Sequence, residues 1–275
     1  MRHGKIIYTV DGIGSISFGV DGRFLIEKFD GTSLGTTKLA TTAINLSGQR
    51  TSRATLNART IPCDLAIRAI NENGKYSYEL LDKLKQDVCK IFNPLYKGTL
   101  TRVNRYGTYC IDVSPSEVPT FEKLVGAIAK FKVNFIADNP IWRDTKTKTY
   151  HIGGENGPNL KIYNTLGIEL PFVFNGTAAV EESYFRLTNE TSGEHITLAD
   201  TMRVEDREFI LNTETCEVLT KASFEDDYQS GDFIFTFQSA VDMVLRPGCN
   251  SFVLDAQNED AVFTIEVTDM FLGVS

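Results

Sequence analysis

The sequence changes its net charge at one short segment, Asp138-Asn139-Pro140-Ile141-Trp142. Residues 1–142 contain 19 Lys and Arg against 13 Asp and Glu, a net charge of +6, whereas residues 143–275 contain 9 against 23, a net charge of −14. Proline disfavours the α conformation in the residue before it, so the Asn139-Pro140 step ends an extended run. Such asymmetry is typical of two domains that face different partners. We therefore predict two domains, residues 1–142 and residues 143–275.

Short apolar or alternating runs recur along the whole chain, bounded by Gly, Asn, Asp and Ser. This pattern is typical of β-sandwiches and β-barrels. In the first domain we predict strands within residues 5–10, 22–29, 55–70, 99–113 and 130–137. In the second domain we predict them within residues 161–163, 168–174, 184–187, 195–199, 208–211, 233–237, 251–254 and 261–267. Turns are expected at residues 104–107, 189–193 and 247–248, where glycine can supply a positive φ.

One segment has the periodicity of an amphipathic helix, residues 78–92. Apolar residues recur there at spacings of three and four, and charged residues occupy the opposite face. Ser77 is the expected N-cap, and Asn93-Pro94 ends the helix. A second helical pattern covers residues 120–130, but it runs directly into a predicted strand.

No reactive constellation emerges from the sequence, and we predict no enzyme, no catalytic residue and no cofactor or metal site. Asp11–Ser17 begins like a dinucleotide loop but lacks its third glycine, so a hairpin is the better interpretation. His3, His151 and His195 stand apart, and the five cysteines show no metal-binding or paired spacing. Glu225-Asp226-Asp227 and Glu181-Glu182 are acidic clusters that we expect to lie in solvated loops, with calcium ligands or paired catalytic carboxylates as the alternatives.

Aromatic residues at two places could bind a ligand or pack in a core. Phe233, Phe235 and Phe237 alternate, so they share one face of a strand, and we expect that face to be buried. Trp142, the single tryptophan, is expected to pack at the domain joint rather than to stack on a ligand. No apolar run approaches the roughly 20 residues that a membrane helix needs, so we expect no membrane insertion.

Three features together resemble the distal tail proteins of long, flexible-tailed bacteriophages. The first is a glycine-rich strand pair near the N-terminus, followed by Gly48-Gln49-Arg50 and then Leu56-Asn57-Ala58-Arg59-Thr60-Ile61, similar to a glycine-containing loop that leads into a strand with Arg-x-Ile. The second is the segment Phe135–Trp142, similar to the Asp-Pro-aromatic end of the family's first domain. The third is Leu245-Arg246-Pro247-Gly248-Cys249-Asn250, similar to Leu-x-Pro-Gly-x-Asn, with a closing Leu-Gly within residues 268–273.

This resemblance implies a mainly β protein. Its N-terminal domain would be a β-barrel or sandwich-like, ring-forming tail-hub domain with one helix, and its C-terminal domain a galectin-like β-sandwich. The implied partners are copies of itself in a hexamer, with two stacked rings as a variant, together with the tail tube protein, the tail-associated lysin and the receptor-binding protein. DNA would only pass through the channel. The implied location is the virion tail tip, after assembly in the host cytoplasm.

Two other functions stay open from the sequence. A carbohydrate-binding module that reads a host cell-surface saccharide would need exposed aromatic residues on a sheet face. A glycosidase or peptidoglycan hydrolase would need converging carboxylates, which the sequence does not indicate. Likeness to a galectin shape does not by itself confer sugar binding.

Overall fold

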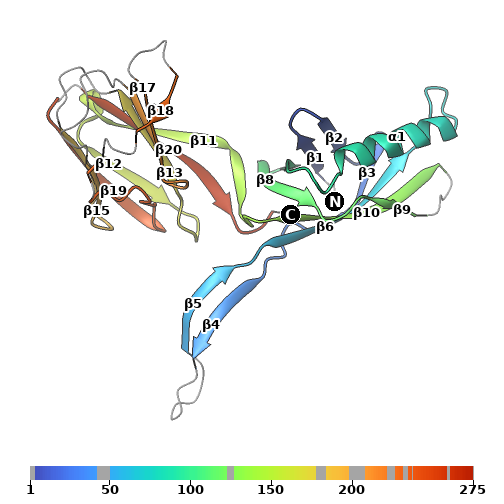
Figure 1. Cartoon of the computed structure of the whole chain (residues 1–275), viewed down its shortest axis with the longest axis horizontal. Helices are drawn as coiled ribbons and strands as arrows, with labels where there is room; N and C mark the ends of the chain where they lie inside the picture. Colours follow the sequence, from blue (N-terminus) through green and yellow to red (C-terminus); the bar gives the residue numbers. More distant parts are fainter. Residues whose placement is uncertain are drawn as a thin grey trace. The chain divides into compact units, whose positions relative to one another are not determined.

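The computed structural model describes residues 4–41, 50–122, 127–177, 184–197, 208–221, 227–231, 235–236, 238–258 and 261–274. Within them the chain is mainly β with one α-helix, as predicted (Figure 1). It forms two compact units, Met1–Thr145 with Phe271–Ser275, and Lys146–Met270. The first unit thus ends three residues beyond Trp142 and also takes in the segment from Phe271, which the expected division at 142 had left in the second domain.

The strands of the first unit are β1 (Lys5–Val10), β2 (Gly14–Phe18), β3 (Phe24–Phe29), β4 (Thr36–Thr41), β5 (Arg50–Leu56), β6 (Arg59–Arg68), β7 (Gly98–Val103), β8 (Thr108–Pro115), β9 (Thr120–Phe121) and β10 (Ile128–Ala137). One group pairs in the order β2-β1-β7-β8, and another in the order β3-β6-β10, all antiparallel. A short pairing of β8 with β10 joins the groups.

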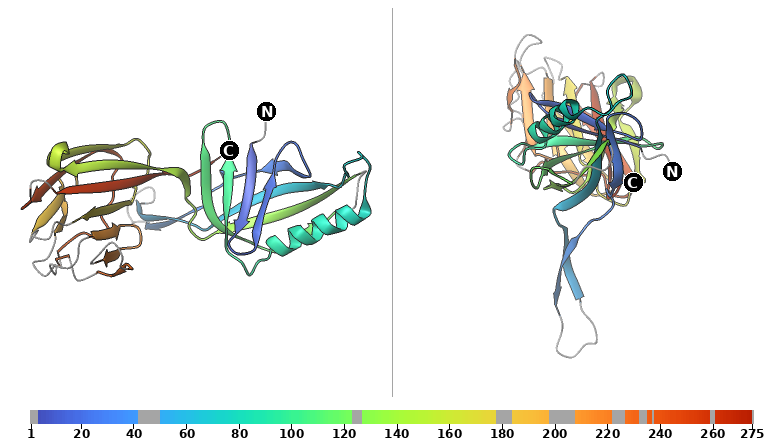
Figure 2. Two further views of the ribbon diagram at one scale, coloured as in Figure 1. Left: turned by 90° about the horizontal axis from the view of Figure 1, so that it is seen from above. Right: turned by 90° about the vertical axis from the view of Figure 1, so that its right-hand side faces the viewer.

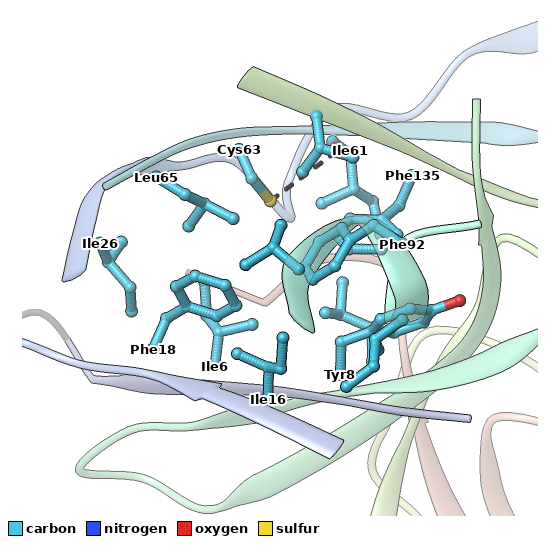
Figure 3. Close-up of a cluster of buried hydrophobic side chains, with 14 of the residues drawn as sticks. Ile6, Tyr8, Ile16, Phe18, Ile26, Ile61, Cys63, Leu65, Phe92 and Phe135 are labelled. Carbon is cyan, nitrogen blue, oxygen red and sulfur yellow. Dashed lines mark hydrogen bonds between the residues drawn. The ribbon is translucent and has the colours of Figure 1, made fainter. Parts of the chain in front are cut away.

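The two groups of strands enclose one core, and their inward side chains point toward one another (Figure 3). Among the described strands the arrangement is sandwich-like and does not close into a barrel, because β2 does not pair with β3 and only the isolated bridge Gly19↔Leu25 links the residue after β2 to β3. Tyr8 is fully buried in this core, with its ring 5.2 Å from that of Phe92 and 4.9 Å from that of Phe135.

Helix α1 (Tyr78–Ile91) covers part of the same core (Figure 2). Its buried residues are Leu81, Leu84, Val88 and Ile91, the spacing expected from the sequence. The Ser77 hydroxyl accepts a hydrogen bond from the Leu80 backbone N–H over 3.2 Å, which confirms the predicted N-cap. The helix ends at Ile91, one residue before the predicted end.

The second unit is a sandwich of two antiparallel sheets. It contains β12 (Asn159–Asn164), β13 (Phe172–Thr177), β14 (Phe185–Asn189), β15 (Glu194–Thr197), β16 (Glu208–Asn212), β17 (Glu217–Lys221), β18 (Gln229–Ser230) and β19 (Gly248–Ala256). One sheet follows the order β18-β17-β16-β13-β20, where β20 is Val262–Phe271, and the other the order β12-β19-β14-β15. Fully buried phenylalanines fill the core, with Phe172 6.0 Å from Phe252 and Phe174 5.9 Å from Phe185 between ring centroids.

Two strands, β11 (Trp142–Gly153) and β20 (Val262–Phe271), carry the chain out of the first unit and back into it. They are neighbours in the sheet order. A short 3-10 helix, η1 (Gly154–Asn156), follows β11.

Several predicted elements differ in the structure. The run 55–70 spans a break at Asn57-Ala58 between β5 and β6, and the run 99–113 is the hairpin β7–β8. The helix predicted over residues 120–130 is wrong at both ends, because β9 occupies its start and β10 begins before its end. Residues 123–126 lie outside the described part. Strand β10 pairs with β6 from Ile128 to Ala137, and this long-range pairing outweighs the local helical pattern.

Candidate functional site

Three donors from distant parts of the sequence converge on the carbonyl oxygen of Gly31. Nε1 of Trp142, Nη1 of Arg59 and the backbone N–H of Val274 each donate to it over 3.1 Å. All these residues belong to the first unit. We call Gly31, Arg59, Trp142, Leu272 and Val274 the joint, because they hold together the segments at which the chain leaves and re-enters this unit.

Arg59 lies near the start of β6 and is 1% exposed. Its Nη2 donates to the carbonyl of Leu272, so one guanidinium bonds two backbone carbonyls from different segments. Burial lowers the pKa of Arg59, and the carboxylate of Asp30 partly offsets this shift. A buried guanidinium is costly unless it is hydrogen-bonded, so its position depends on both acceptors.

Position 31 has no room for a side chain, which explains the glycine found there. A Cβ at this position would lie 2.5 Å from the carbonyl oxygen of Val274 and 2.9 Å from the ring of Phe29. The preceding Asp30 shapes the turn, since its carboxylate accepts from the Thr32 N–H over 2.9 Å and from the Thr32 hydroxyl over 2.7 Å. Both bonds, the hydroxyl's first, hold the pKa of Asp30 below its usual value.

Aromatic side chains surround the joint. Trp142 is fully buried, and its ring centroid lies 6.2 Å from that of Phe29. The guanidinium of Arg102 in β7 stacks 4.8 Å from the Phe29 ring, and burial lowers the pKa of Arg102. Tyr109 packs against Phe271 at 5.0 Å. Trp142 therefore serves packing, as expected.

The joint contains a residue from each of the three sequence features that carry the family resemblance. Arg59 comes from the Arg-x-Ile strand, Trp142 from the segment that ends the first domain, and Leu272 from the closing Leu-Gly. The sequence indicates each motif separately without relating them to one another, and Gly31 carries no signal of its own in the sequence. Gly48 and Gln49 of the first motif lie outside the described residues.

The other part of the third feature, residues 245–250, organises a loop of the second unit. Asn250 is fully buried; its Oδ1 accepts from the Arg246 N–H over 3.0 Å, and its Nδ2 donates to the Arg246 carbonyl over 2.8 Å. Nδ2 of Asn189 also donates to Asn250 Oδ1 over 3.4 Å. Gly248 has a φ of 105°, which confirms the expected positive φ at this turn.

The residues considered for chemistry do not come together in the described part of the chain. His151 is exposed on β11 and His195 lies on β15, while His3, Glu181, Glu182, Glu225 and Asp226 lie outside the described residues. Among the described residues no group of three or more His, Cys, Asp or Glu could hold a metal ion. All five cysteines are free, and burial raises the pKa of the Cys63 thiol. Asp11–Ser17 spans the tight β1–β2 hairpin, as expected.

The alternating phenylalanines are described only in part. Phe235 is 7% exposed, with its ring 5.7 Å from Phe209, so it belongs to the core, as expected for its position. Phe233 and Phe237 lie outside the described residues. No helix in the described part is long and apolar enough to cross a membrane.

A shallow hollow of about 300 Å³ lies on the outer face of the β18-β17-β16-β13-β20 sheet. Asn175, Glu208, Tyr228 and Thr264 are among its lining residues. The Tyr228 hydroxyl and Nζ of Lys221 both contact the Glu208 carboxylate, each over 3.0 Å. These polar groups satisfy one another, and burial together with the neighbouring Glu208 carboxylate raises the pKa of Tyr228.

Residues 12–137 match the family model of a phage tail protein RIFT-related domain. The fold of the whole chain is similar to that of the SPP1 Dit protein, described as a paradigm of the hub adsorption apparatus in phages that infect Gram-positive bacteria. That likeness has a TM-score of 0.72 and 14% identity, and it covers 97% of this chain and 99% of that one. A chain of the phage p2 baseplate in its activated conformation with Sr is also similar, with a TM-score of 0.51 and 12% identity, covering 97% and 98% of the two chains. No curated protein sequence matches.

Residues 12–137 thus match a phage tail protein domain, and the chain as a whole shares the mainly β fold of the SPP1 Dit protein. The resemblance to siphophage distal tail and baseplate hub proteins, drawn from the sequence, agrees with the family match of the first domain and with the fold of the whole chain.

Proposed function

We propose that this protein is the ring-forming hub of a phage tail tip. In this proposal copies of the first domain, residues 1–142, form a hexameric ring, single or as two stacked rings, that joins the tail tube protein to the tip. The family match over residues 12–137 and the fold likeness to a protein described as a hub support it. DNA passes through the channel, and no step of catalysis or membrane insertion is assigned.

The observation that carries the proposal is the two-stranded sheet β4–β5. Within the described residues these strands pair only with each other (Figure 1). A lone hairpin is marginally stable in water, and unpaired edges invite strands of another chain. Its sequence is also basic, with Lys38, Arg50 and Arg53 and no acidic residue from 31 to 58. A neighbouring copy in a closed ring would cover these edges and supply the missing contacts.

The second domain, residues 143–275 of the expected division, is proposed to dock the tail-associated lysin and the receptor-binding protein. Its net charge of −14 disfavours contact between copies of itself, because like charges repel. The first domain has the opposite net charge, +6, so the two domains are expected to contact different partner proteins. The virion tail tip follows as its location, with the host cytoplasm as the place of assembly.

Removing the hairpin tests the ring directly. Asn57 N–H donates to the Gly35 carbonyl over 3.0 Å, so the two ends of the hairpin are adjacent and a short turn can replace residues 36–56. We expect full-length protein to elute as a six- or twelve-subunit species in size exclusion with light scattering, and the shortened protein as a folded monomer. Trp142 emission, unchanged in the shortened protein, is the control for folding. A shortened protein that still forms the same ring would contradict the role of the hairpin.

A further inference from the structure

The segment Phe271–Val274, which we call the return segment, completes the core of the first unit. Val274 is 5% exposed within the main core cluster, and Phe271 packs on Tyr109. The backbone of the segment is bonded as well, since Val274 N–H donates to Gly31 and Leu272 accepts from Arg59. The first unit therefore lacks part of its core until this segment docks.

The return segment reaches the first unit only by way of the second. Residues 146–270 form the second unit and lie between the two parts of the first. Within the second unit, β11 and β20 bring their ends together: the hydroxyls of Thr147 and Thr268 are 3.2 Å apart, and Nζ of Lys148 lies 2.7 Å from a carboxylate oxygen of Asp269. A folded second unit thus delivers the return segment next to residues 142–145.

We propose that the return segment is a latch that couples the folding of the second unit to the completion of the first, and so restricts ring assembly to chains whose second unit is folded. The assembly part of this inference rests on the proposed ring function. If the second unit is unfolded, docking must close a loop of residues 146–270. The probability that the two ends of such a loop meet falls with the 3/2 power of loop length. The equilibrium constant for docking of the return segment is therefore lowered by about 10³-fold.

An undocked latch leaves defects that disfavour assembly. Arg59 loses the Leu272 acceptor and keeps a buried guanidinium with one fewer partner. The place of Val274 in the core opens to water, and the Gly31 carbonyl keeps only its two side-chain donors. Because Trp142 shares that carbonyl and is the single tryptophan, its emission reports the state of the latch.

Gly31→Ala blocks the latch, because the new Cβ meets Val274 at 2.5 Å. Gly19→Ala is the matched control in the same unit, since a Cβ there lies 3.7 Å from its nearest neighbour. In full-length protein we expect Gly31→Ala to lower the urea midpoint of the Trp142 transition and to abolish the multimer, with Gly19→Ala unchanged. Val274→Ala provides a milder block should Gly31→Ala not fold. Identical behaviour of the blocked and control variants overturns the latch.

The coupling is tested by loosening the second unit from within. Phe174→Ala opens its buried phenylalanine cluster, none of whose residues belongs to the joint. At urea concentrations where amide exchange shows the second unit of this variant to be open, we expect Trp142 to be released as well. We add Thr147→Cys and Thr268→Cys to Phe174→Ala, so that oxidation closes the loop with a disulfide. The oxidised protein should recover the wild-type midpoint of the Trp142 transition, whereas the reduced protein should not.

Two results would overturn the coupling. In the first, the Trp142 transition stays at the wild-type midpoint while the second unit is open; in the second, the crosslink does not change that midpoint. The ring proposal and the latch proposal can be refuted separately. A wild-type protein that is monomeric at all concentrations contradicts the ring, yet the Trp142 transitions of the same variants still decide the latch.

Discussion

Nε1 of Trp142 donates a hydrogen bond to the carbonyl of Gly31 over 3.1 Å, across 111 residues of sequence. This contact fixes the end of the first domain to the turn after β3. Its strength comes from burial, because neither group can exchange the bond for one to water. The joint therefore holds the strand that leaves the unit in a single position.

Trp142→Phe keeps an aromatic ring but removes this bond and leaves a small cavity. We expect a loss of about 1–3 kcal/mol in the free energy of unfolding. Urea unfolding followed by circular dichroism measures it. Tyr163→Phe, at a side chain that is 66% exposed, is the matched control and should have no effect. Equal stability of the two variants would show that the joint contributes little.

Asn250→Asp replaces a donor with an acceptor at the buried loop of the second unit. The new oxygen faces the Arg246 carbonyl, where Nδ2 now donates over 2.8 Å. We expect a loss of about 2–3 kcal/mol, because a buried polar contact becomes unsatisfied. Asn159→Asp, exposed at the start of β12, is the control for the added charge. A thermal midpoint equal to that of the control would refute this role for Asn250.

Tyr8→Phe is expected to be neutral or stabilising by up to about 1 kcal/mol, since the Tyr8 hydroxyl is buried without a partner among the described residues. Burial raises the pKa of Tyr8 to about 12. The folded state thus resists ionisation of Tyr8, and the stability that its neutral form contributes is lost as pH rises from about 10, the unfolded value, to about 12. Tyr8→Phe should remove this alkaline loss. Urea midpoints that fall equally with pH in both proteins would contradict the assignment.

Asp30 has a lowered pKa, so its contribution has the opposite pH dependence. The stabilisation is present above the unfolded pKa of about 3.9 and is lost as pH falls through the lower folded value. Asp30→Asn should therefore be less stable than wild type at pH 6, with the difference shrinking below pH 4. Thermal midpoints at several pH values measure this, and a difference that is constant with pH would exclude the carboxylate as its source.

We also predict that the protein binds no host cell-wall saccharide with millimolar or better affinity. Arg186, Asn189, Glu194 and His195, the polar candidates of the β14–β15 hairpin, lie beside no exposed aromatic ring in the contacts described, and Asn189 and Glu194 bond to Asn250 and Arg246. The hollow beside Tyr228, which is 41% exposed, is the alternative location. Titration calorimetry on the full-length protein should show no saturable heat. Saturable binding that Tyr228→Ala abolishes would favour a carbohydrate-binding function instead.

Local features of the fold could be predicted because nearby residues determine them. The helix beginning at Tyr78, its Ser77 cap and the turn at Gly248 follow from spacing, capping and backbone freedom within a few residues. The pattern at residues 120–130 failed for the converse reason. There the pairing of β10 with β6, whose partners lie 60 or more residues away in sequence, decided the structure.

The joint could be predicted only in pieces. Arg59, Trp142 and Leu272 each lie in a motif that resembles the family, but a motif does not say what its residues contact. Their common acceptor is a backbone carbonyl, which every residue possesses, so the sequence carries no mark at Gly31. The role of this glycine follows only from the 2.5 Å separation that a Cβ would have from Val274.

The position of residues 146–270 between two parts of the first unit also has a consequence for protein engineering. Because β11 and β20 are neighbouring strands, the module is attached through a two-stranded stem whose ends lie about 4.8 Å apart. Any replacement domain whose own termini sit on adjacent antiparallel strands meets that geometric requirement. The first unit thus offers a defined attachment point for a replacement second domain, provided that the graft preserves residues 142–145 and 271–274.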